Sequence, residues 1–292
     1  MKKKSSLKHT GAFWAFCAPC CILFGVFFLV PLVLSIAFSF TNYDGWKTID
    51  FVGLKNYITL FKDSKFYLSL GRTLLYTVCT LPFRVIIPLL VAVLLCSKRV
   101  AGKSLTRTMV YIPVLMSALV VGITINWMFS QEYGLVNFII RSLGGTALEW
   151  SLNPRLATFV IAFASVWASI GFNMILYIGG INSISNDLYE AATIDGASGV
   201  QAFFRITVPM LAPTTFMVVL LSTVNLLKEY ALVQGITQGG PGLSTTFIIQ
   251  YIFDKGFNQM QYGYASAIST VVMIIFALIA FAQFKVNNGG ET

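Results

Sequence analysis

The chain has 292 residues with a mean hydropathy of +0.78, and 57% of them are hydrophobic while only 11% are charged. About a quarter of the residues of a soluble domain are charged, so this composition excludes an ordinary soluble protein and indicates an integral membrane protein. The formal net charge of +9 fits membrane topology and attraction to anionic lipid. We therefore expect membrane lipid, and no nucleic acid, among the partners of the chain.

Apolar runs long enough to cross a membrane occur six times. A helix needs about 20 residues to cross a hydrocarbon core of roughly 30 Å. The runs lie near 12–40, 73–96, 108–130, 156–182, 213–235 and 264–285. The first run is too long for a signal-peptide core and no small-x-small cleavage site follows it, so we expect an uncleaved span. The sequence predicts an all-α integral membrane fold, with one transmembrane domain over 1–292.

Lysine and arginine residues set the predicted orientation. Basic residues precede the first run at positions 2, 3, 4 and 8, and four more fall within 97–107. Cytoplasmic loops are enriched in such residues, so we predict that the N- and C-termini are cytoplasmic. The loop 183–212 carries only one basic residue, Arg205. We place it on the cytoplasmic side because consecutive spans alternate in direction and its neighbouring loops are assigned by their basic residues.

Residues for catalysis, metal binding or nucleotide binding are scarce. The five cysteines, at positions 17, 20, 21, 79 and 96, fall in predicted spans, and His9 is the single histidine. We therefore expect no catalytic residue, no metal site and no cofactor. Gly102-Lys103-Ser104 resembles the end of a phosphate-binding loop, but Ser97 stands where that loop needs glycine. We expect no ATP binding by this chain.

Five prolines lie within predicted spans, where each removes a backbone hydrogen bond and can kink the helix. They are Pro19, Pro31, Pro82, Pro88 and Pro113. The sequence does not separate a hinge from a static bend.

The most informative segment lies between the fourth and fifth apolar runs. Its sequence, LYEAATIDGASGVQAFFRITVP from position 188, predicts a short helix over 188–194, a break at Gly196, a second helix over 201–207 and a stop at Pro209. A charged, glycine-punctuated segment between two membrane-length runs lies in water. Its pattern favours docking on another protein.

This segment carries a family resemblance. Glu190-Ala191-Ala192, Asp195-Gly196 and the later Ile206 and Pro209 resemble the cytoplasmic EAA loop of ABC importer permeases. Further segments resemble the sugar-importer branch, the maltose and glycerol-phosphate type. They are FVGLKNY at 51–57, YIP at 111–113, GLVN at 134–137, TQGGPG at 237–242 followed by Ser244 and Thr245, and GYASA at 263–267.

The resemblance implies a six-transmembrane-helix permease fold with a cytoplasmic coupling-helix loop, in a bacterial-type plasma (inner) membrane. It implies three kinds of partner: a second homologous permease subunit around a shared pore, two cytoplasmic ATPase subunits, and an extracytoplasmic sugar-binding protein. The implied cargo is a di- or oligosaccharide, with glycerol phosphate or a monosaccharide as the second choice. ATP hydrolysis would take place on separate subunits, so the chain itself would be no enzyme.

Within the ATPase-coupling loop, Glu190 is the expected polar anchor, while Ala191 and Ala192 keep the helix thin enough to enter a groove on the ATPase. Gly196 permits a sharp turn, and Asp195 is expected to bond to local backbone N–H groups. Two plainer interpretations remain open: Glu190 as a solvated helix residue, and Gly196 as an ordinary helix cap.

Polar residues within the spans are the candidates for a substrate pathway, because a polar group in hydrocarbon normally faces a cavity or a partner. The candidates are Asn173, Tyr177, Asn225, Lys228, Glu229 and Tyr230. Lys228 and Glu229 point about 100° apart on a helix, so we expect one of them to pair with a neighbour or reach the interface. Arg84 fits a structural ion pair, carbonyl contacts or substrate binding.

Two loops are expected outside the membrane. The glycine-rich 238–242 segment fits either the pore mouth or an ordinary turn, and 41–71 is expected to cover the outer mouth or meet the binding protein. An ion-coupled secondary transporter and a membrane enzyme are the alternative functions. The first needs internal repeats and the second clustered acids or histidines, and neither explains the loop at 190–209.

Overall fold

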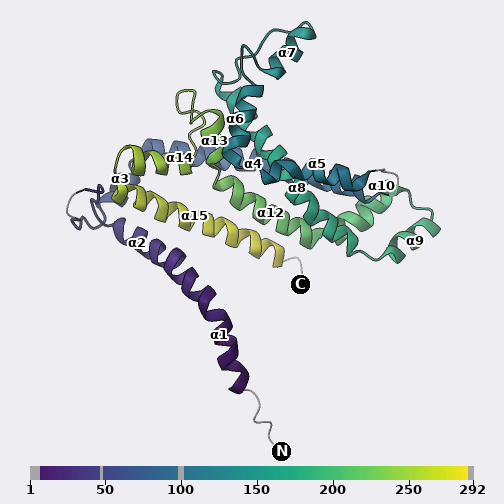
Figure 1. Cartoon of the computed structure of the whole chain (residues 1–292), viewed down its shortest axis with the longest axis horizontal. Coiled ribbons are helices and arrows are strands. Elements are labelled where there is room, and N and C mark those ends of the chain that lie inside the picture. Colours follow the sequence, from purple (N-terminus) through teal and green to yellow (C-terminus); the bar gives the residue numbers. More distant parts are fainter. Residues whose placement is uncertain (1–6, 47–48, 98–101, 289–292) are drawn as a thin grey trace, which may run out of the picture. The chain divides into compact units, whose positions relative to one another are not determined.

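The computed structural model describes residues 7–46, 49–97 and 102–288. These residues are almost entirely helical, and the only strand-like pairing among them is an isolated antiparallel bridge between Thr41 and Phe51. The predicted all-α membrane fold is therefore confirmed in the described part of the chain (Figure 1).

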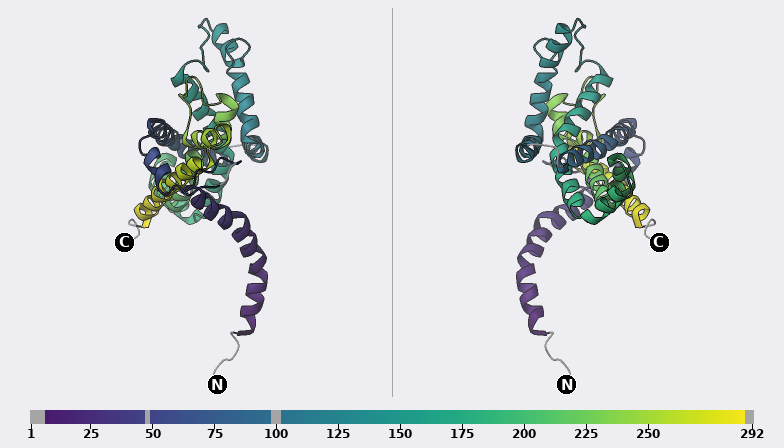
Figure 2. Two further views of the ribbon diagram at one scale, coloured as in Figure 1. Left: turned by 90° about the vertical axis from the view of Figure 1, so that its left-hand side faces the viewer. Right: turned by 90° about the vertical axis from the view of Figure 1, so that its right-hand side faces the viewer.

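Four described helical stretches are long and apolar enough to cross a membrane. The first joins α1 (Leu7–Phe24), the π-helix η1 (Gly25–Leu29) and α2 (Val30–Phe38), and is visible as one continuous purple ribbon in Figures 1 and 2. The others are α4 (Ser64–Cys96), α8 (Pro154–Asn182) and α15 (Tyr262–Asn288). Helix α4 runs on through both Pro82 and Pro88.

Two further crossings are bent helix pairs. Helices α5 (Lys103–Leu115) and α6 (Ala118–Met128) meet at 101°, and the segment Gly199–Met210 meets α12 (Ala212–Leu227) at 66°. Counting each pair as one crossing gives six. The third predicted span is thus broken, because Met116 adopts an extended conformation (φ −83°, ψ 146°) soon after Pro113.

The fifth predicted span is also broken. Helix α12 ends at Leu227, and α13 (Ala231–Ile236) begins after a short interruption. Tyr230 is non-helical (φ −139°), and the Glu229 carboxylate accepts a hydrogen bond from the Leu232 N–H (Oε1···N 3.3 Å). A carboxylate that bonds to the first free N–H groups of a helix favours a helix start, so Glu229 stabilises the break.

Residues Met1–Ser64 and Ile252–Ile275 form one compact unit. Its helices are the first stretch, α3 (Lys55–Leu60), η3 (Asp254–Asn258) and the first part of α15. The Asn56 amide donates to the Ser39 and Thr41 carbonyls at 2.9 and 2.8 Å. The Gly263 N–H donates to the Tyr43 carbonyl, and a Cβ on Gly263 would lie 2.1 Å from the Thr41 oxygen. Two motifs distant in sequence, at 51–57 and 263–267, therefore fix the same turn.

Residues Lys65–Tyr251 and Phe276–Thr292 form the second unit. One of its two buried apolar clusters includes Tyr76, Ile161, Leu226 and Phe247; the other, which we call the lower cluster, consists of Ala92, Leu95, Met174, Tyr177, Ile178, Ile184, Leu211 and Val218. Helices α6 and α13 touch backbone to backbone. A Cβ on Gly122 would lie 3.0 Å from the Gly235 Cα, so small residues permit this close packing, as is typical of membrane helices.

In this second unit, the buried side-chain amide of Asn137 holds together the loop segments that precede and follow α7 (Leu135–Ser142). We call these segments, together with α7, the connection around α7. The Asn137 amide group donates to the Gln131 and Leu148 carbonyls, and its oxygen accepts from the Leu148 N–H and from the Trp150 indole N–H at 2.9 Å. Gly134 leaves no room for a side chain, since a Cβ would lie 2.3 Å from the Ser130 oxygen. The GLVN motif therefore has a structural explanation.

Candidate functional site

Residues 183–212 form a pair of short helices joined by a tight turn. The first, α9 (Asn186–Ile194), begins where the Ser185 hydroxyl accepts a hydrogen bond from the Asp187 N–H. The turn follows at Gly196, whose φ of +77° disfavours any residue with a side chain. The Ala197 N–H donates to the Ala192 carbonyl at 2.8 Å, which closes the end of α9.

A capping box starts the second helical segment. The Ser198 N–H donates to the Gln201 side chain at 2.7 Å, and the Ser198 hydroxyl accepts from the Gln201 N–H at 3.3 Å. Sequence reasoning missed this feature, although a serine followed three residues later by glutamine is its known signature. Asp195 was expected to hold the turn, and this was wrong. Within the described residues, the N–H groups of Gly196 and Ala197 donate to the Thr193 and Ala192 carbonyls and not to the Asp195 carboxylate.

The predicted stop at Pro209 lies one residue before the observed end of the segment at Met210, where the chain bends by 66° into α12. Helix α10 (Gly199–Ala202) continues into the π-helix η2 (Phe203–Thr207) and then α11 (Val208–Met210), so Pro209 lies inside a helical segment. A proline ring clashes with the carbonyl four residues before it in a regular α-helix. Here that turn is a wider π turn, in which the Val208 N–H bonds to the Phe203 carbonyl, so the ring is accommodated.

The two short helices are tied to each other and to the body of the second unit. The Tyr189 hydroxyl and the Thr207 hydroxyl lie 2.9 Å apart and form a hydrogen bond. Tyr189 and Ile206 pack against the lower cluster, which contains Met174 on α8 and the fully buried Leu211. The helix pair therefore packs against the same apolar cluster as α8 and α12.

The outer face of the helix pair is apolar and exposed. Ile194, Val200 and Phe204 are 86%, 67% and 65% exposed. Glu190 is exposed on the same segment, as are Ala191 and Pro209, while Ala192 is half-buried. Exposed apolar side chains beside a charged residue are typical of a docking surface for another protein. We call this surface, residues 190–204, the docking face.

A buried polar cluster lies between α4, α8 and α12. The Arg84 guanidinium lies 3.9 Å from the Glu229 carboxylate (Nη2···Oε2), with both side chains buried, and it donates a hydrogen bond to the Ser165 hydroxyl. The Asn173 amide donates to the Arg84 carbonyl at 2.9 Å and to the Ser222 hydroxyl at 3.2 Å. Of the interpretations proposed for Arg84, the structure supports the ion pair.

The other candidates for a substrate pathway lie elsewhere in the second unit. Tyr177 is fully buried in the lower cluster, Asn225 and Lys228 are exposed, and Tyr230 is half-buried. Lys228 and Glu229 diverge as expected, since one is exposed and the other is buried against Arg84. The structure brings Asn173 and Glu229 together around Arg84, but it does not gather the six candidates into one site.

The glycine-rich loop after α13 is a compact turn. Gly239 has a φ of +93°, and a Cβ there would lie 2.8 Å from the Thr246 hydroxyl. The Thr237 and Thr245 hydroxyls are hydrogen-bonded at 2.7 Å, and Thr245 also donates to the Gly240 carbonyl. Hydroxyl groups thus satisfy the backbone of the loop from inside.

Groups of three or more histidine, cysteine or acidic side chains that would bind a metal are absent from the described residues. The cysteines at 17, 20, 21, 79 and 96 are free thiols.

Comparison with known proteins gives the same picture over nearly the whole chain. Residues 51–288 match the family described as the binding-protein-dependent transport system inner membrane component. The chain is 32% identical over 279 residues to the arabinooligosaccharides transport system permease protein AraP of Bacillus subtilis, covering 94% of this chain and 88% of that protein. It is also 32% identical over 276 residues to the lactose transport system permease protein LacF of Rhizobium radiobacter, covering 93% and 92%.

A solved structure has the same fold. A chain of a bacterial ABC transporter involved in the import of the acidic polysaccharide alginate superposes with a TM-score of 0.83 at 24% identity, covering 97% of this chain and 96% of that one. Taken with the helix pair at 183–212, these matches establish the family. The chain belongs to the inner membrane permease components of binding-protein-dependent ABC transport systems.

Proposed function

We propose that this chain is one of two permease subunits that together form a pore for the uptake of a sugar, which an extracytoplasmic binding protein delivers. A di- or oligosaccharide is the favoured cargo. The relatives AraP and LacF are named for arabinooligosaccharide and lactose transport, and this similarity supports the proposal.

The docking face carries the proposal. Exposed Ile194, Val200 and Phe204 form an apolar surface, and Glu190 adds a charge beside it. A cytoplasmic ATPase subunit that receives this surface would bury the three apolar side chains and pair Glu190 with a basic or N–H donor group. In this role Ala191 and Ala192 keep α9 thin, Gly196 makes the turn, and Pro209 continues the second helical segment. ATP is hydrolysed on that separate subunit.

Coupling follows from the internal contacts of the segment. The Tyr189–Thr207 hydrogen bond joins the two short helices, and Leu211 anchors them against α8 and α12. When the two ATPase subunits close on ATP, the helix pair moves with them as one piece. Its movement tilts the attached membrane helices and changes the side on which the pore is open.

The orientation belongs to the same proposal. The docking face must be cytoplasmic to meet an ATPase, which places the N- and C-termini on the same side and the connection around α7 outside. The basic residues within 97–107 favour the same arrangement. The chain 1–292 acts as one transmembrane permease domain in the bacterial plasma membrane, and the loops at 41–71 and 238–242 lie toward the outer mouth of the pore.

Affinity purification tests the assignment. The chain is isolated in mild detergent from cells that also express the neighbouring permease, ATPase and binding-protein genes, and ATP hydrolysis is measured with a panel of sugar-loaded binding proteins. We expect an ATPase subunit to co-purify and its turnover to rise with one sugar. Glu190→Lys should abolish recovery of the ATPase, while Glu132→Lys, the same charge reversal at an exposed site outside the docking face, should not.

Two results would overturn the proposal. One is wild-type ATPase recovery and sugar uptake in the Glu190→Lys variant. The other is a chain that purifies alone and takes up sugar in vesicles driven by an ion gradient, which would make it a secondary transporter.

A further inference from the structure

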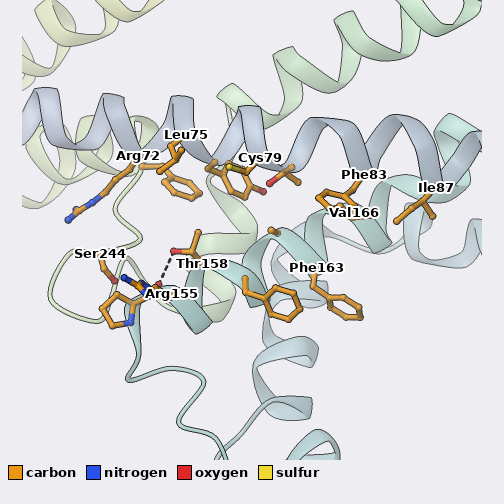
Figure 3. A pocket seen from close by; sticks show the side chains of 16 residues that line it. Arg72, Leu75, Cys79, Phe83, Ile87, Arg155, Thr158, Phe163, Val166 and Ser244 are labelled. Atoms are coloured by element: carbon orange, nitrogen blue, oxygen red, sulfur yellow. Dashed lines mark hydrogen bonds between the residues drawn. The ribbon is translucent and has the colours of Figure 1, made fainter.

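A large apolar groove lies between two membrane helices of the second unit and is separate from the docking face. It encloses about 720 Å³ and is lined by one face of α4, one face of α8, Ser244 and Phe247. Figure 3 shows the side chains of both helices turned toward each other across it. The volume falls within the range of roughly 300–1,000 Å³ that is typical of small-molecule sites.

The wall of the groove is suited to hydrocarbon. Along α4, Cys79, Phe83 and Ile87 follow one another at helical spacing, and Ala162 and Val166 face them from α8. Phe83 is 57% exposed, so the groove is open to the side. A sugar needs many hydrogen-bonding partners. The hydroxyl groups in this lining are those of Tyr76, Thr80, Thr158 and Ser244, while most of the other lining side chains are apolar. An alkyl chain needs only apolar contact.

One end of the groove is positively charged. Arg72 on α4 and Arg155 on α8 both line it, and Figure 3 places both beside Ser244, away from Phe83 and Ile87. Arg72 donates to the Leu243 carbonyl, a neutral partner that leaves its charge uncompensated. Within the described residues, neither arginine lies within 4.0 Å of a carboxylate. Two guanidinium groups at the same end of a groove, without a carboxylate partner, favour a bound phosphate.

The dimensions match a lipid in one leaflet. Arg72 and Ile87 are fifteen residues apart on one helix, which corresponds to about 22 Å. One leaflet contributes roughly 15 Å of hydrocarbon. An acyl chain that starts at a headgroup beside the arginines therefore stays within the groove. Both arginines stand near the N-terminal ends of their helices, which the proposed orientation places at the outer surface of the membrane.

We propose that this groove binds one anionic phospholipid of the outer leaflet, with its phosphate between Arg72 and Arg155 and an acyl chain along Cys79, Phe83 and Ala162. The charge at the groove end selects an anionic lipid over a zwitterionic one. The lipid fills an apolar space that would otherwise lie open between α4 and α8.

Photoreactive lipids test the proposal on the full chain, assembled with its partners in nanodiscs. The probes are phosphatidylglycerol and phosphatidylcholine, each with a diazirine in the acyl chain, and crosslinked residues are mapped by mass spectrometry. We expect phosphatidylglycerol to label α4 and α8 within the groove, and unlabelled phosphatidylglycerol to compete better than phosphatidylcholine. An attraction of about fivefold in affinity is typical for each basic residue near a lipid surface.

Matched variants separate this site from general lipid contact. Arg72→Gln with Arg155→Gln should reduce groove labelling by roughly twentyfold or more at limiting probe, whereas Lys62→Gln, an exposed lysine of the first unit, should leave it unchanged. Ala162→Trp fills the groove and should block labelling while the arginines remain. Each variant is first checked for monodisperse elution.

Three outcomes would overturn the proposal. They are equal labelling by both lipids, unchanged labelling in the double arginine variant, and crosslinks in the groove that appear on the isolated chain but vanish when the second permease chain is bound. The last would make the groove a protein interface. None of these results depends on whether an ATPase docks at Glu190.

Discussion

A single residue with no accessible surface, Asn137, explains the GLVN motif at 134–137. The Asn137 amide is completely buried and bonds to the backbone of the segments on both sides of α7 as well as to Trp150. An asparagine side chain is short and carries two N–H donors and one acceptor oxygen. It can therefore bond to several loop segments at once. Its role here is structural, and it needs no ligand to explain it.

Replacing Asn137 by alanine should destabilise the protein. The Leu148 N–H and the Trp150 indole N–H would lose their acceptor inside the protein, and each unpaired buried donor costs about 1–3 kcal/mol. We expect the midpoint of thermal unfolding, followed by size-exclusion chromatography in detergent, to fall by roughly 5–10 °C. Ser142→Ala on the same helix, where the side chain is exposed, is the control. Equal midpoints for the two variants would contradict the role assigned to Asn137.

The turn glycine of the helix pair offers a test of backbone conformation alone. A Cβ on Gly196 meets nothing within 4 Å, but the φ of +77° strains any side-chain-bearing residue by about 1–2 kcal/mol. We expect Gly196→Ala to weaken ATPase recovery by roughly fivefold or more, because the docking face depends on this turn. Gly71→Ala is the matched control, since Gly71 is equally open but lies within helix α4, outside the docking face. If both variants behaved like the wild type, the turn would have no part in docking.

Helical elements in this protein are interrupted in two distinct ways. In η1 and η2 the chain forms a π turn, and a proline follows two residues later, Pro31 in one case and Pro209 in the other. The wider turn relieves the clash of the proline ring, so the helix runs on to Phe38 after Pro31 and to Met210 after Pro209. In α12 and α13 the chain breaks completely, and the Glu229 carboxylate caps the new start.

These interruptions show what the sequence could and could not predict. Hydropathy identifies the six crossings, because a membrane demands long apolar runs wherever the chain passes. It does not identify the breaks at Met116 and Tyr230, because an apolar run has the same composition whether its backbone is straight or bent. The pairing of Arg84 with Glu229 was also not predictable as a specific contact, since the two residues are far apart in sequence and only tertiary packing brings them together. The helix–turn–helix geometry at 183–212 was predictable because its motif is local.

Helix packing between α6 and α13 depends on two glycines that face each other. A Cβ on Gly235 would lie 2.7 Å from the Leu119 carbonyl oxygen, so even alanine forces the helices apart. Forcing extra atoms into a packed contact typically costs about 1–3 kcal/mol. We expect Gly235→Ala to lower the thermal unfolding midpoint in detergent by several degrees, and Gly179→Ala on α8, where a Cβ meets nothing within 4 Å, to leave it unchanged or raise it. Equal midpoints would show that α6 and α13 separate freely.

At the scale of the whole molecule, the function requires the docking face and the connection around α7 to lie on opposite sides of the membrane. The basic residues within 97–107 favour this proposed orientation, because translocation of lysine and arginine across the bilayer is disfavoured. The two positions Tyr133 and Ile194 are 89% and 86% exposed, so a thiol at either one is open to a water-soluble reagent.

Cysteine labelling decides the orientation and the docking together. The five native cysteines are replaced by alanine, and Tyr133→Cys or Ile194→Cys is introduced for reaction with a membrane-impermeant maleimide. We expect Tyr133→Cys to react in intact cells, and Ile194→Cys to react only after the membrane is permeabilised. In permeabilised cells without the ATPase, Ile194→Cys should react as fast as Tyr133→Cys. With the ATPase bound, Ile194→Cys should be protected, since the docking face is then covered. Labelling of Ile194→Cys in intact cells would reverse the topology, and equal rates with and without the ATPase would place docking elsewhere on the chain.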